Sequence, residues 1–315
     1  MSLFRRTIRF VLAGTAVLMA VLSAIALFVA RLITAPPREK VWATPSDLGL
    51  AFEPIEFPAR DDAVRLSGWF VPAKVGLAPT VVVVHGWLWN RLGSTGEGFV
   101  ANVTHGGKVD LLRLTQALHR AGYHVVQYDG RNHGQSASHG PVTFGYMEAN
   151  DLLGCLDYLA KRPDVDQHGL GVVGFSMGAN TALYALARTT AVRAAVLVQP
   201  TSIAHFQQRF TRYMVGPLAR PLNALIHFFV QRLGGVPLHA LDPLTIAPAT
   251  GHTPLLFIQG EGDPWGSVDN VAHIAMEAPG TVATLWVDAK DRFAGYQYPI
   301  EHPELITSFL GDYLK

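Results

Sequence analysis

Ser176 stands between two glycines in the stretch GFSMG, residues 174–178. The stretch ends an apolar run and precedes a segment with helical periodicity, GANTALYALAR. At a sharp turn from a strand to a helix, a serine is held in a strained backbone conformation with its hydroxyl exposed. The residues two before and two after the serine then come too close for a Cβ atom, and Gly174 and Gly178 satisfy that demand. The pattern therefore predicts a nucleophile at Ser176.

A second group of residues follows the buried run VVVV, namely His85, Gly86 and Trp87. In a doubly wound sheet, this end of a strand faces the active-site crevice. Backbone N–H groups there can stabilise the negative charge that develops on a carbonyl oxygen under attack. We expect the two donors to be the N–H groups of Trp87 and of Met177, the residue after the serine.

The segments around these motifs alternate between β-rich and helical patterns from about residue 50. The expected strands are FEPIEF (52–57), VRLSGWFV (64–71), TVVVV (80–84), YHVVQYD (123–129), LGVVGF (170–175), AAVLVQ (194–199), PLLFIQG (254–260) and TVATLWV (281–287). The expected helices are DLLRLTQALHRAG (110–122), MEANDLLGCLDYLAKR (147–162), GANTALYALAR (178–188) and PELITSFLGDYL (303–314). Such regular alternation implies parallel strands with crossover helices on both faces.

Two segments interrupt this alternation. Residues 87–109 are Gly-rich and irregular, and residues 201–250 form a long, apolar, partly helical insertion between two strands. An insertion of that length without strand character is typical of a lid or a binding element. Its helix-spaced apolar residues either line an acyl pocket, touch a membrane or pack on the body: Phe206, Phe210, Tyr213, Met214, Leu222, Ile226, Phe229 and Leu233.

Four motifs in order resemble the α/β-hydrolase superfamily over roughly residues 50–315. They are the His-Gly pair after the run VVVV, YDGRNHGQS (128–136), GFSMG and QGEGDPW (259–265). The resemblance implies an α/β-hydrolase fold, with a mostly parallel, doubly wound sheet and a helical lid insertion. It also implies a serine hydrolase, since esterases, lipases and dienelactone-hydrolase-like enzymes belong to that superfamily. Within YDGRNHGQS, Arg131 and His133 resemble residues that organise the crevice.

The chain order in that superfamily is nucleophile, acid, histidine. Asp263 follows a buried strand in a Gly-Glu-Gly-Asp loop, so the resemblance makes it the acid that orients the catalytic imidazole. Glu261 and Asp269 are weaker substitutes. A carboxylate that is only solvated by its loop is the alternative.

The expected histidine is missing from VDAKDRFAGYQYPIEHPE, residues 287–304. Superfamily members carry a histidine before an aromatic residue here, and alignment on Phe293 puts Arg292 in its place. Arginine stays protonated and cannot take the proton of a serine. Loss of the histidine costs a well-studied serine protease about a millionfold in turnover.

Three explanations remain open for the missing base. The base is His302, if the chain before the final helix forms a loop that delivers it, although capping of that helix is an alternative role. A second route uses His85 or His133 from an unusual position. In the third, the protein is a non-catalytic binding or scaffold protein. With Ser176, Asp263 and His302 as the catalytic set, we expect a hydrolase that acts on an ester, thioester or amide.

The N-terminus predicts a membrane anchor. Residues 10–30 carry no charge and are long enough to span a bilayer as a helix, with three arginines before them and one directly after. The arginines are Arg5, Arg6, Arg9 and Arg31. The excess before the span favours a cytoplasmic N-terminus and an extracytoplasmic body. A signal peptide cleaved near Ala24 and Ala26 is the alternative, although this apolar run exceeds the usual signal core.

These features divide the chain into a basic segment (1–9), an anchor (10–30), a stiff linker (31–48) and a hydrolase domain (49–315). With 49% hydrophobic residues and a net charge of +1, the chain is globular and lacks the basic patches of nucleic-acid binders. The sequence contains neither metal-ligand spacings nor a phosphate-binding loop, and GLGVVG (169–174) lies in a strand rather than after one. We expect no cofactor, a small acyl substrate with apolar character, and a buried Cys155.

Overall fold

The structure is a computed structural model that describes residues 2–104 and 106–315. Within these residues, eight strands form one sheet in the order β1-β2-β6-β3-β7-β8-β9-β10. Strand β2 is antiparallel to β1 and β6, and the pairs from β6 to β10 are parallel. The strands are β1 Glu53–Pro58, β2 Arg65–Val71, β3 Ala78–Val84, β6 His124–Tyr128, β7 Val165–Phe175, β8 Ala194–Val198, β9 Leu255–Gly260 and β10 Thr281–Val287. The predicted mostly parallel sheet is confirmed.

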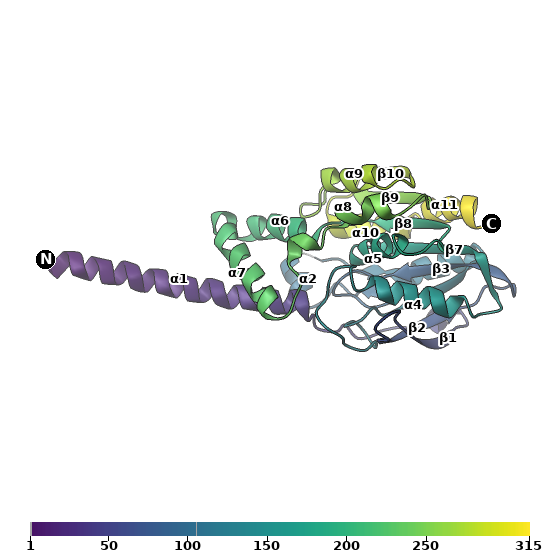
Figure 1. Ribbon diagram of the computed structural model, residues 1–315, viewed down its shortest axis with the longest axis horizontal. Coiled ribbons are helices and arrows are strands. Elements are labelled where there is room, and N and C mark those ends of the chain that lie inside the picture. Colours follow the sequence, from purple (N-terminus) through teal and green to yellow (C-terminus); the bar gives the residue numbers. More distant parts are fainter. Residues whose placement is uncertain (1, 105) are drawn as a thin grey trace.

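Helices cover both faces of the sheet, as Figure 1 shows. On one face lie α4 Ala149–Leu159, α5 Met177–Leu186 and α9 Val268–Glu277, whose apolar residues join one core cluster with the strands. On the other face lie α3 Leu111–Arg120, α10 Arg292–Glu301 and α11 Glu304–Leu314, which join a second cluster. Residues of β3 such as Val82 and Val83 alternate between the two clusters. This two-sided burial is the reason for the uninterrupted valine run.

The segment between β3 and α3 holds short elements around three glycines with positive φ, Gly93, Gly96 and Gly98. They are β4 Gly93–Ser94, α2 Phe99–Thr104 and β5 Val109–Asp110, with β4 and β5 paired antiparallel. The segment predicted to be irregular thus contains a small ribbon and one short helix, which lie beside the carboxyl end of β3.

Residues 201–250 form a helical layer outside the sheet. The layer consists of α6 Ile203–Val215, η2 Gly216–Leu218, α7 Ala219–Arg232, η3 Leu238–Ala240, α8 Pro243–Ile246 and η4 Ala247–Ala249. Helices α6 and α7 form a hairpin that projects from the body beside the N-terminal helix (Figure 1). Apolar residues of both helices share a third cluster with Phe144 and Met177 near the carboxyl ends of the strands.

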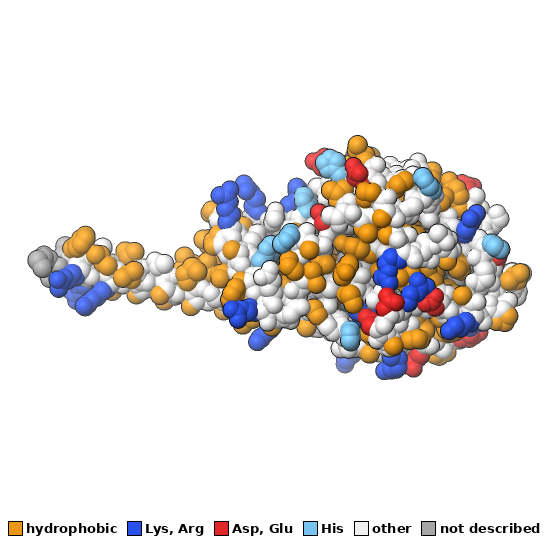
Figure 2. All heavy atoms as spheres, viewed as in Figure 1, with side chains coloured by type: hydrophobic (Ala, Val, Ile, Leu, Met, Phe, Trp, Pro, Cys, Tyr) orange, Lys and Arg blue, Asp and Glu red, His pale blue; other side chains and the backbone are white. Residues whose placement is uncertain are grey.

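The N-terminal helix α1 spans Ser2–Thr34 and extends beyond the body (Figure 1). From Phe4 to Thr34 it is long and apolar enough to cross a membrane. Its last third packs on α7 through Leu22, Ala26, Ala30 and Ile33, which are buried in the same cluster as Ile226. Figure 2 shows the apolar side chains of the outer part of α1 exposed.

The segment after α1 is fixed to the body by hydrogen bonds. The Arg38 guanidinium donates to the Ser136 carbonyl at 2.5 Å, and the Asn90 amide donates to the Lys40 carbonyl at 2.9 Å. The short helix η1, Pro45–Leu48, follows. The first residues of the predicted stiff linker (31–48) thus belong to α1, and residues 35–48 follow the surface of the body through these contacts.

Candidate active site

Ser176 lies at the turn between β7 and α5, in a strained backbone conformation. Its φ is 53° and its ψ is −114°, which L-residues rarely adopt. Its N–H donates to the Val198 carbonyl of β8 at 2.9 Å, while its carbonyl accepts from Ala179 and Asn180 in the first turn of α5. These bonds hold the turn in place, and its side chain is half-buried.

The two flanking glycines permit the close approaches that this turn requires. A Cβ atom on Gly174 would lie 2.4 Å from the Gly178 carbonyl oxygen, and one on Gly178 would lie 2.2 Å from the Val84 carbonyl oxygen. Both distances are far below van der Waals contact. The glycines therefore allow α5 to begin directly against β3, and this placement exposes the serine hydroxyl at the end of the sheet.

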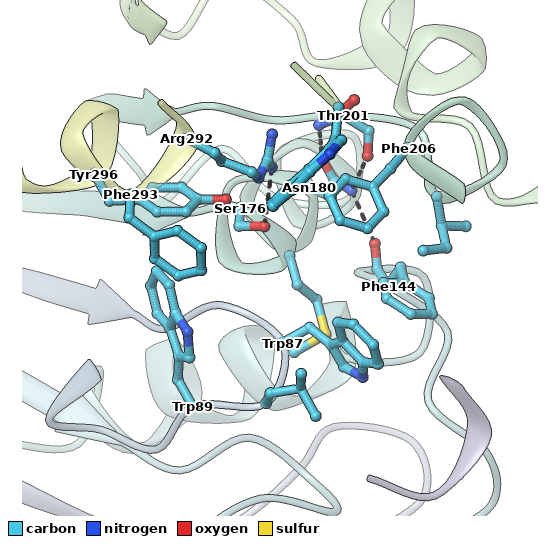
Figure 3. Close-up of a pocket in the computed structure, with 14 residues that line it drawn as sticks. Trp87, Trp89, Phe144, Ser176, Asn180, Thr201, Phe206, Arg292, Phe293 and Tyr296 are labelled. Carbon is cyan, nitrogen blue, oxygen red and sulfur yellow. Dashed lines mark hydrogen bonds between the residues drawn. The ribbon is translucent and has the colours of Figure 1, made fainter. Parts of the chain in front are cut away.

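Ser176 opens into a cavity of about 90 Å³. Figure 3 shows its lining, in which aromatic side chains surround the serine hydroxyl. The lining residues are Trp87, Leu88, Trp89, Phe144, Ser176, Met177, Asn180, Thr201, Ile203, Phe206, Trp265, Arg292, Phe293 and Tyr296. A small, mostly apolar cavity with a few polar groups suits the reacting end of a small molecule.

Trp87 and Met177, the expected oxyanion donors, both line this cavity. Among the residues that the structure describes, neither backbone N–H has a hydrogen-bond acceptor. Met177 is the first residue of α5, so its N–H also lies at the positive end of the helix dipole. Both groups are thus available to an anionic oxygen beside Ser176.

Asp263 lies in the loop after β9 and is buried. Its Oδ1 accepts from the N–H groups of Trp265 and Gly266, both at 3.0 Å. Its Oδ2 accepts a short hydrogen bond from Nη1 of Arg292. The carboxylate is therefore fully engaged, and an arginine occupies the side on which a catalytic imidazole would lie.

Arg292 connects Asp263 to Ser176. Its other terminal nitrogen, Nη2, lies 3.4 Å from the Ser176 Oγ and 3.3 Å from the Gln199 carbonyl oxygen. The side chain is only 5% exposed. Burial alone would lower the pKa of Arg292, but the Asp263 carboxylate outweighs that effect, and the net pKa is raised. Arg292 therefore stays cationic and donates to Ser176 without being able to accept its proton.

The backbone of Arg292 is fixed as firmly as its side chain. Its carbonyl accepts from the Gln199 amide at 2.8 Å, and Asp291 caps α10 by accepting from the Ala294 N–H at 2.8 Å. The first turn of α10 therefore lies directly against the end of β8, and the guanidinium extends from there over the serine (Figure 3).

Tyr296 lies one helical turn after Arg292, and its hydroxyl points toward Ser176 (Figure 3). Burial raises the pKa of Tyr296, and the charge of Arg292 and hydrogen bonds to Ser176 and Arg292 offset only part of that rise. The phenol is therefore neutral near pH 7 and is a further donor or acceptor beside the nucleophile.

His302, the expected base, is not brought to this site. Residues 292–301 form helix α10 where a loop was expected, and ten residues of helix advance about 15 Å. His302 caps the far end of α10, is exposed, and has its Nδ1 3.3 Å from a Glu304 carboxylate oxygen. The structure therefore brings Ser176 and Asp263 together with Arg292, and leaves His302 outside the cavity.

The alternative bases are also engaged elsewhere. The buried His85 donates from Nδ1 to the Gly86 carbonyl at 2.7 Å and accepts at Nε2 from the Gly130 N–H at 2.9 Å. Burial and the nearby His133 lower the pKa of His85 to about 4. His133 contacts the Arg131 carbonyl through Nδ1 at 2.8 Å. Neither ring lines the serine cavity.

The other residues singled out in the sequence lie outside the serine cavity, where they are exposed or packed in the body. Glu261 and Asp269 are exposed, so neither replaces Asp263 next to the cavity. Arg131 pairs with Asp62 at 2.6 Å and with Asp151 at 2.7 Å, which holds the loop after β6. Cys155 is fully buried in α4, and burial raises the pKa of its thiol. Among the described residues, no cluster of His, Cys, Asp or Glu has the geometry to hold a metal ion.

Two residues that contact Arg292 were not predicted as site residues from the sequence: Tyr296 and Gln199. Tyr296 follows Arg292 by four residues, a spacing that places both on one helix face. A helix was not expected there because RFAGYQYPIE contains a glycine and a proline, both poor helix formers. Gln199 follows β8 with a φ of 51°, which no sequence pattern indicates.

Comparison with known proteins agrees with this geometry. A family model described as the alpha/beta hydrolase fold matches residues 79–233. The esterase Pf2001 of Pyrococcus furiosus is 24% identical with a TM-score of 0.69, over 90% of this chain and 99% of that one. The acylaminoacyl peptidase of Pyrococcus horikoshii is 19% identical with a TM-score of 0.58, over 86% of this chain and 43% of that one. The α/β hydrolase GrgF of a Penicillium species is 16% identical with a TM-score of 0.59, over 84% of this chain and 99% of that one.

No curated protein matches the chain. The family match covers the strands and helices that build the nucleophile turn, and the structural matches extend over the rest of the body. The chain thus has the α/β-hydrolase fold, and the comparisons support its place in the α/β-hydrolase superfamily.

Proposed function

We propose that this chain is a membrane-anchored serine hydrolase that attacks an ester, thioester or amide through an acyl-Ser176 intermediate. The observation that carries the proposal is the strained turn at Ser176, whose hydroxyl faces a cavity beside two free N–H donors. Strain of this kind costs about 1–3 kcal/mol and persists where the surrounding structure enforces it. The esterase-like structural neighbours support a hydrolase.

Arg292 changes how such a reaction proceeds. Arg292 cannot take the proton of the Ser176 hydroxyl. Hydroxide from solvent removes that proton instead, which gives water and the Ser176 alkoxide. The guanidinium beside Oγ stabilises that alkoxide, and the N–H groups of Trp87 and Met177 stabilise the tetrahedral oxyanion. The leaving group takes a proton from water, and hydroxide then hydrolyses the acyl-serine. The reaction is slow and accelerates with pH.

Two details of the proposal concern His302 and the anchor. His302 acts as the base only if the last turns of α10 unwind and return the chain to the cavity. Residues 10–30 of α1 act as the anchor, with the N-terminus in the cytoplasm because most of the arginines precede the span. The body then lies on the extracytoplasmic side.

A second function is favoured by the Asp263–Arg292 ion pair itself. A guanidinium directed at the serine, together with two N–H donors, binds a carboxylate without any reaction. In this candidate function the chain is a non-catalytic binder of an acyl carboxylate on a hydrolase fold.

A fluorophosphonate probe distinguishes the two functions. The full chain in detergent is treated with the probe and assayed on an ester panel, beside Ser176→Ala and His302→Ala. Slow labelling and slow hydrolysis that are lost in Ser176→Ala support the hydrolase. If wild type is not labelled and hydrolyses no ester at any pH, the hydrolase is refuted and the non-catalytic binder is supported. Loss of labelling in a folded His302→Ala variant would show that His302 reaches the site.

A further inference from the structure

A second cavity lies between the N-terminal helix and the α6–α7 hairpin. It has a volume of about 480 Å³, and we call it the α1–α6 groove. One wall is α1 from Ala24 to Ile33, and the other is α6 from Ile203 to Val215. The lining is apolar except for Gln207 and Thr211. The volume is within the usual range for a site that takes a small molecule.

The groove adjoins the cavity of the nucleophile. Three residues, Trp87, Ile203 and Phe206, line both. The ring of Trp87 extends away from Ser176 in Figure 3, and Trp87 also lines the groove. Only these three side chains therefore separate an apolar chain in the groove from a reacting group at Ser176.

The outer end of the groove lies at the level of the predicted membrane. The uncharged residues 10–30 give about 31 Å of helix, close to the thickness of a bilayer core. The groove residues Ala24, Ile25 and Phe28 belong to the body-side end of that stretch. The groove thus begins beside the hydrocarbon of the adjacent leaflet.

The tip of the α6–α7 hairpin has the composition of a membrane-contacting surface. Its exposed apolar side chains, Tyr213, Met214 and Leu218, lie between two exposed arginines, Arg212 and Arg220. Arginines of this kind pair with lipid phosphates while apolar neighbours enter the acyl region. Figure 2 shows this cationic and apolar end of the hairpin beside α1.

We propose that the α1–α6 groove takes one acyl chain of a phospholipid from the leaflet next to the body and presents its ester carbonyl to Ser176. The direction of the groove matches the direction of the lipid. In that leaflet, the ester lies toward the body and the chain points along α1 into the bilayer. The lipid rises toward Ser176 without inverting. This inference rests on the proposed function for the anchor and for the reaction at Ser176.

Photo-crosslinking tests the groove independently of catalysis. The full chain is reconstituted in phosphatidylcholine vesicles in which part of the lipid carries a diazirine in the middle of one acyl chain. Adducts on α6 at Phe206 and Phe210, inside the groove, are expected in wild type and in Ser176→Ala. Adducts on α1 do not by themselves support the groove, because any spanning helix contacts lipid.

The matched variants are Ala24→Trp and Ala13→Trp. Both residues are exposed on nearly the same face of α1, but only Ala24 lines the groove. Because the indole occupies part of the groove, Ala24→Trp should lower the α6 adducts by about tenfold, which corresponds to about 1.4 kcal/mol of binding. Ala13→Trp should leave them unchanged. Neither substitution touches the face of α1 that packs on α7.

Absence of α6 adducts in wild type, or equal adducts in both variants, would overturn the groove. The two proposals fail separately. If Ala24→Trp lowers the adducts but no Ser176-dependent hydrolysis is found, the lipid groove is supported and the hydrolase is refuted. Hydrolysis of short esters without α6 adducts leaves the hydrolase and removes the groove.

Discussion

Replacement of Arg292 by histidine should give the site the base that it lacks. Arg292 has one terminal nitrogen on Asp263 and the other 3.4 Å from the Ser176 Oγ. An imidazole at this position is directed at the same two neighbours but reaches less far. Its N–H donates to Asp263, which fixes the tautomer, and its other nitrogen accepts the proton of the serine.

The size of the gain follows from the geometry. A well-placed general base contributes about 10²–10⁴ in rate and must lie about 2.6–3.2 Å from the proton donor. The imidazole side chain is shorter than arginine, and the Arg292 nitrogen is already beyond that range. Arg292→His should therefore reach the lower end of the range, about a hundredfold in kcat/KM.

The assay is hydrolysis of a short nitrophenyl ester between pH 5 and 9. Wild type should accelerate with pH without a plateau, because hydroxide is its base. Arg292→His should reach a plateau above the pKa of the new imidazole, near 6.5 unless its surroundings shift it. The double variant Arg292→His with Ser176→Ala should lose the gain.

Arg292→Gln is the control for loss of the positive charge alone. Both single variants leave Asp263 without its cation, so both should lose thermal stability to a similar degree. A folded Arg292→His variant that hydrolyses no faster than Arg292→Gln at every pH would refute the reasoning. Ser176 would then not be placed to use a base at this position.

Three further predictions concern the stability of the site. Gly178→Ala should destabilise the fold by at least about 1–3 kcal/mol and abolish serine labelling, because its Cβ would lie 2.2 Å from a backbone carbonyl oxygen. The control Gly76→Ala has open space around its Cβ and should leave the melting temperature unchanged. Asp263→Ala should cost about 3–5 kcal/mol in denaturant unfolding because it leaves a buried guanidinium unpaired, and the exposed Asp269→Ala should cost almost nothing. The pKa of His85 is about 4 in the fold and 6.5 in the unfolded chain, so the unfolded state binds the extra proton and the unfolding free energy should fall by roughly 3 kcal/mol between pH 6.5 and 4; His85→Asn should remove that part of the pH dependence.

The sheet and the nucleophile turn could be predicted from the sequence because their signals are local. A run of valines is typical of a strand buried on both faces of a sheet. The steric requirement of the nucleophile turn is met within the five residues of GFSMG. The acid position and Arg292 could be placed because each follows a predicted strand at a short distance. In each case a strand end fixes where the next side chain lies.

The position of His302 could not be predicted because it depends on a helix that the sequence disfavours. Gly295 and Pro299 indicate a loop between the last strand and the last helix. In the fold, an aspartate cap at Asp291 and the burial of Tyr296 against the core stabilise α10 despite those residues. Tertiary packing thus outweighs local propensity, and His302 is carried away from the cavity.

The packing of α1 on the hairpin was also absent from the sequence signal. Leu22, Ala26, Ala30 and Ile33 form a stripe at helical spacing, which would indicate a buried face in a soluble helix. In α1 the residues on the other faces are apolar as well, so this stripe cannot be recognised from the sequence. A membrane span and a packed helix therefore have similar sequence patterns, and only the fold shows that the last third of α1 packs on α7.

The hydrogen-bond donors around Ser176 also affect the rate of product release in the proposed reaction. Hydrolysis of an acyl group yields a carboxylate, which carries its full charge in the ground state, whereas an ester carbonyl gains charge only during attack. In the proposed reaction, Arg292 and the N–H groups of Trp87 and Met177 therefore stabilise the carboxylate product as well as the oxyanion, whereas the neutral ester gains less from them. A neutral imidazole would not do so to the same degree. The proposed hydrolase and the proposed binder therefore share one expectation: the guanidinium of Arg292 favours retention of an acyl carboxylate, and in the hydrolase this retention slows the release of the product.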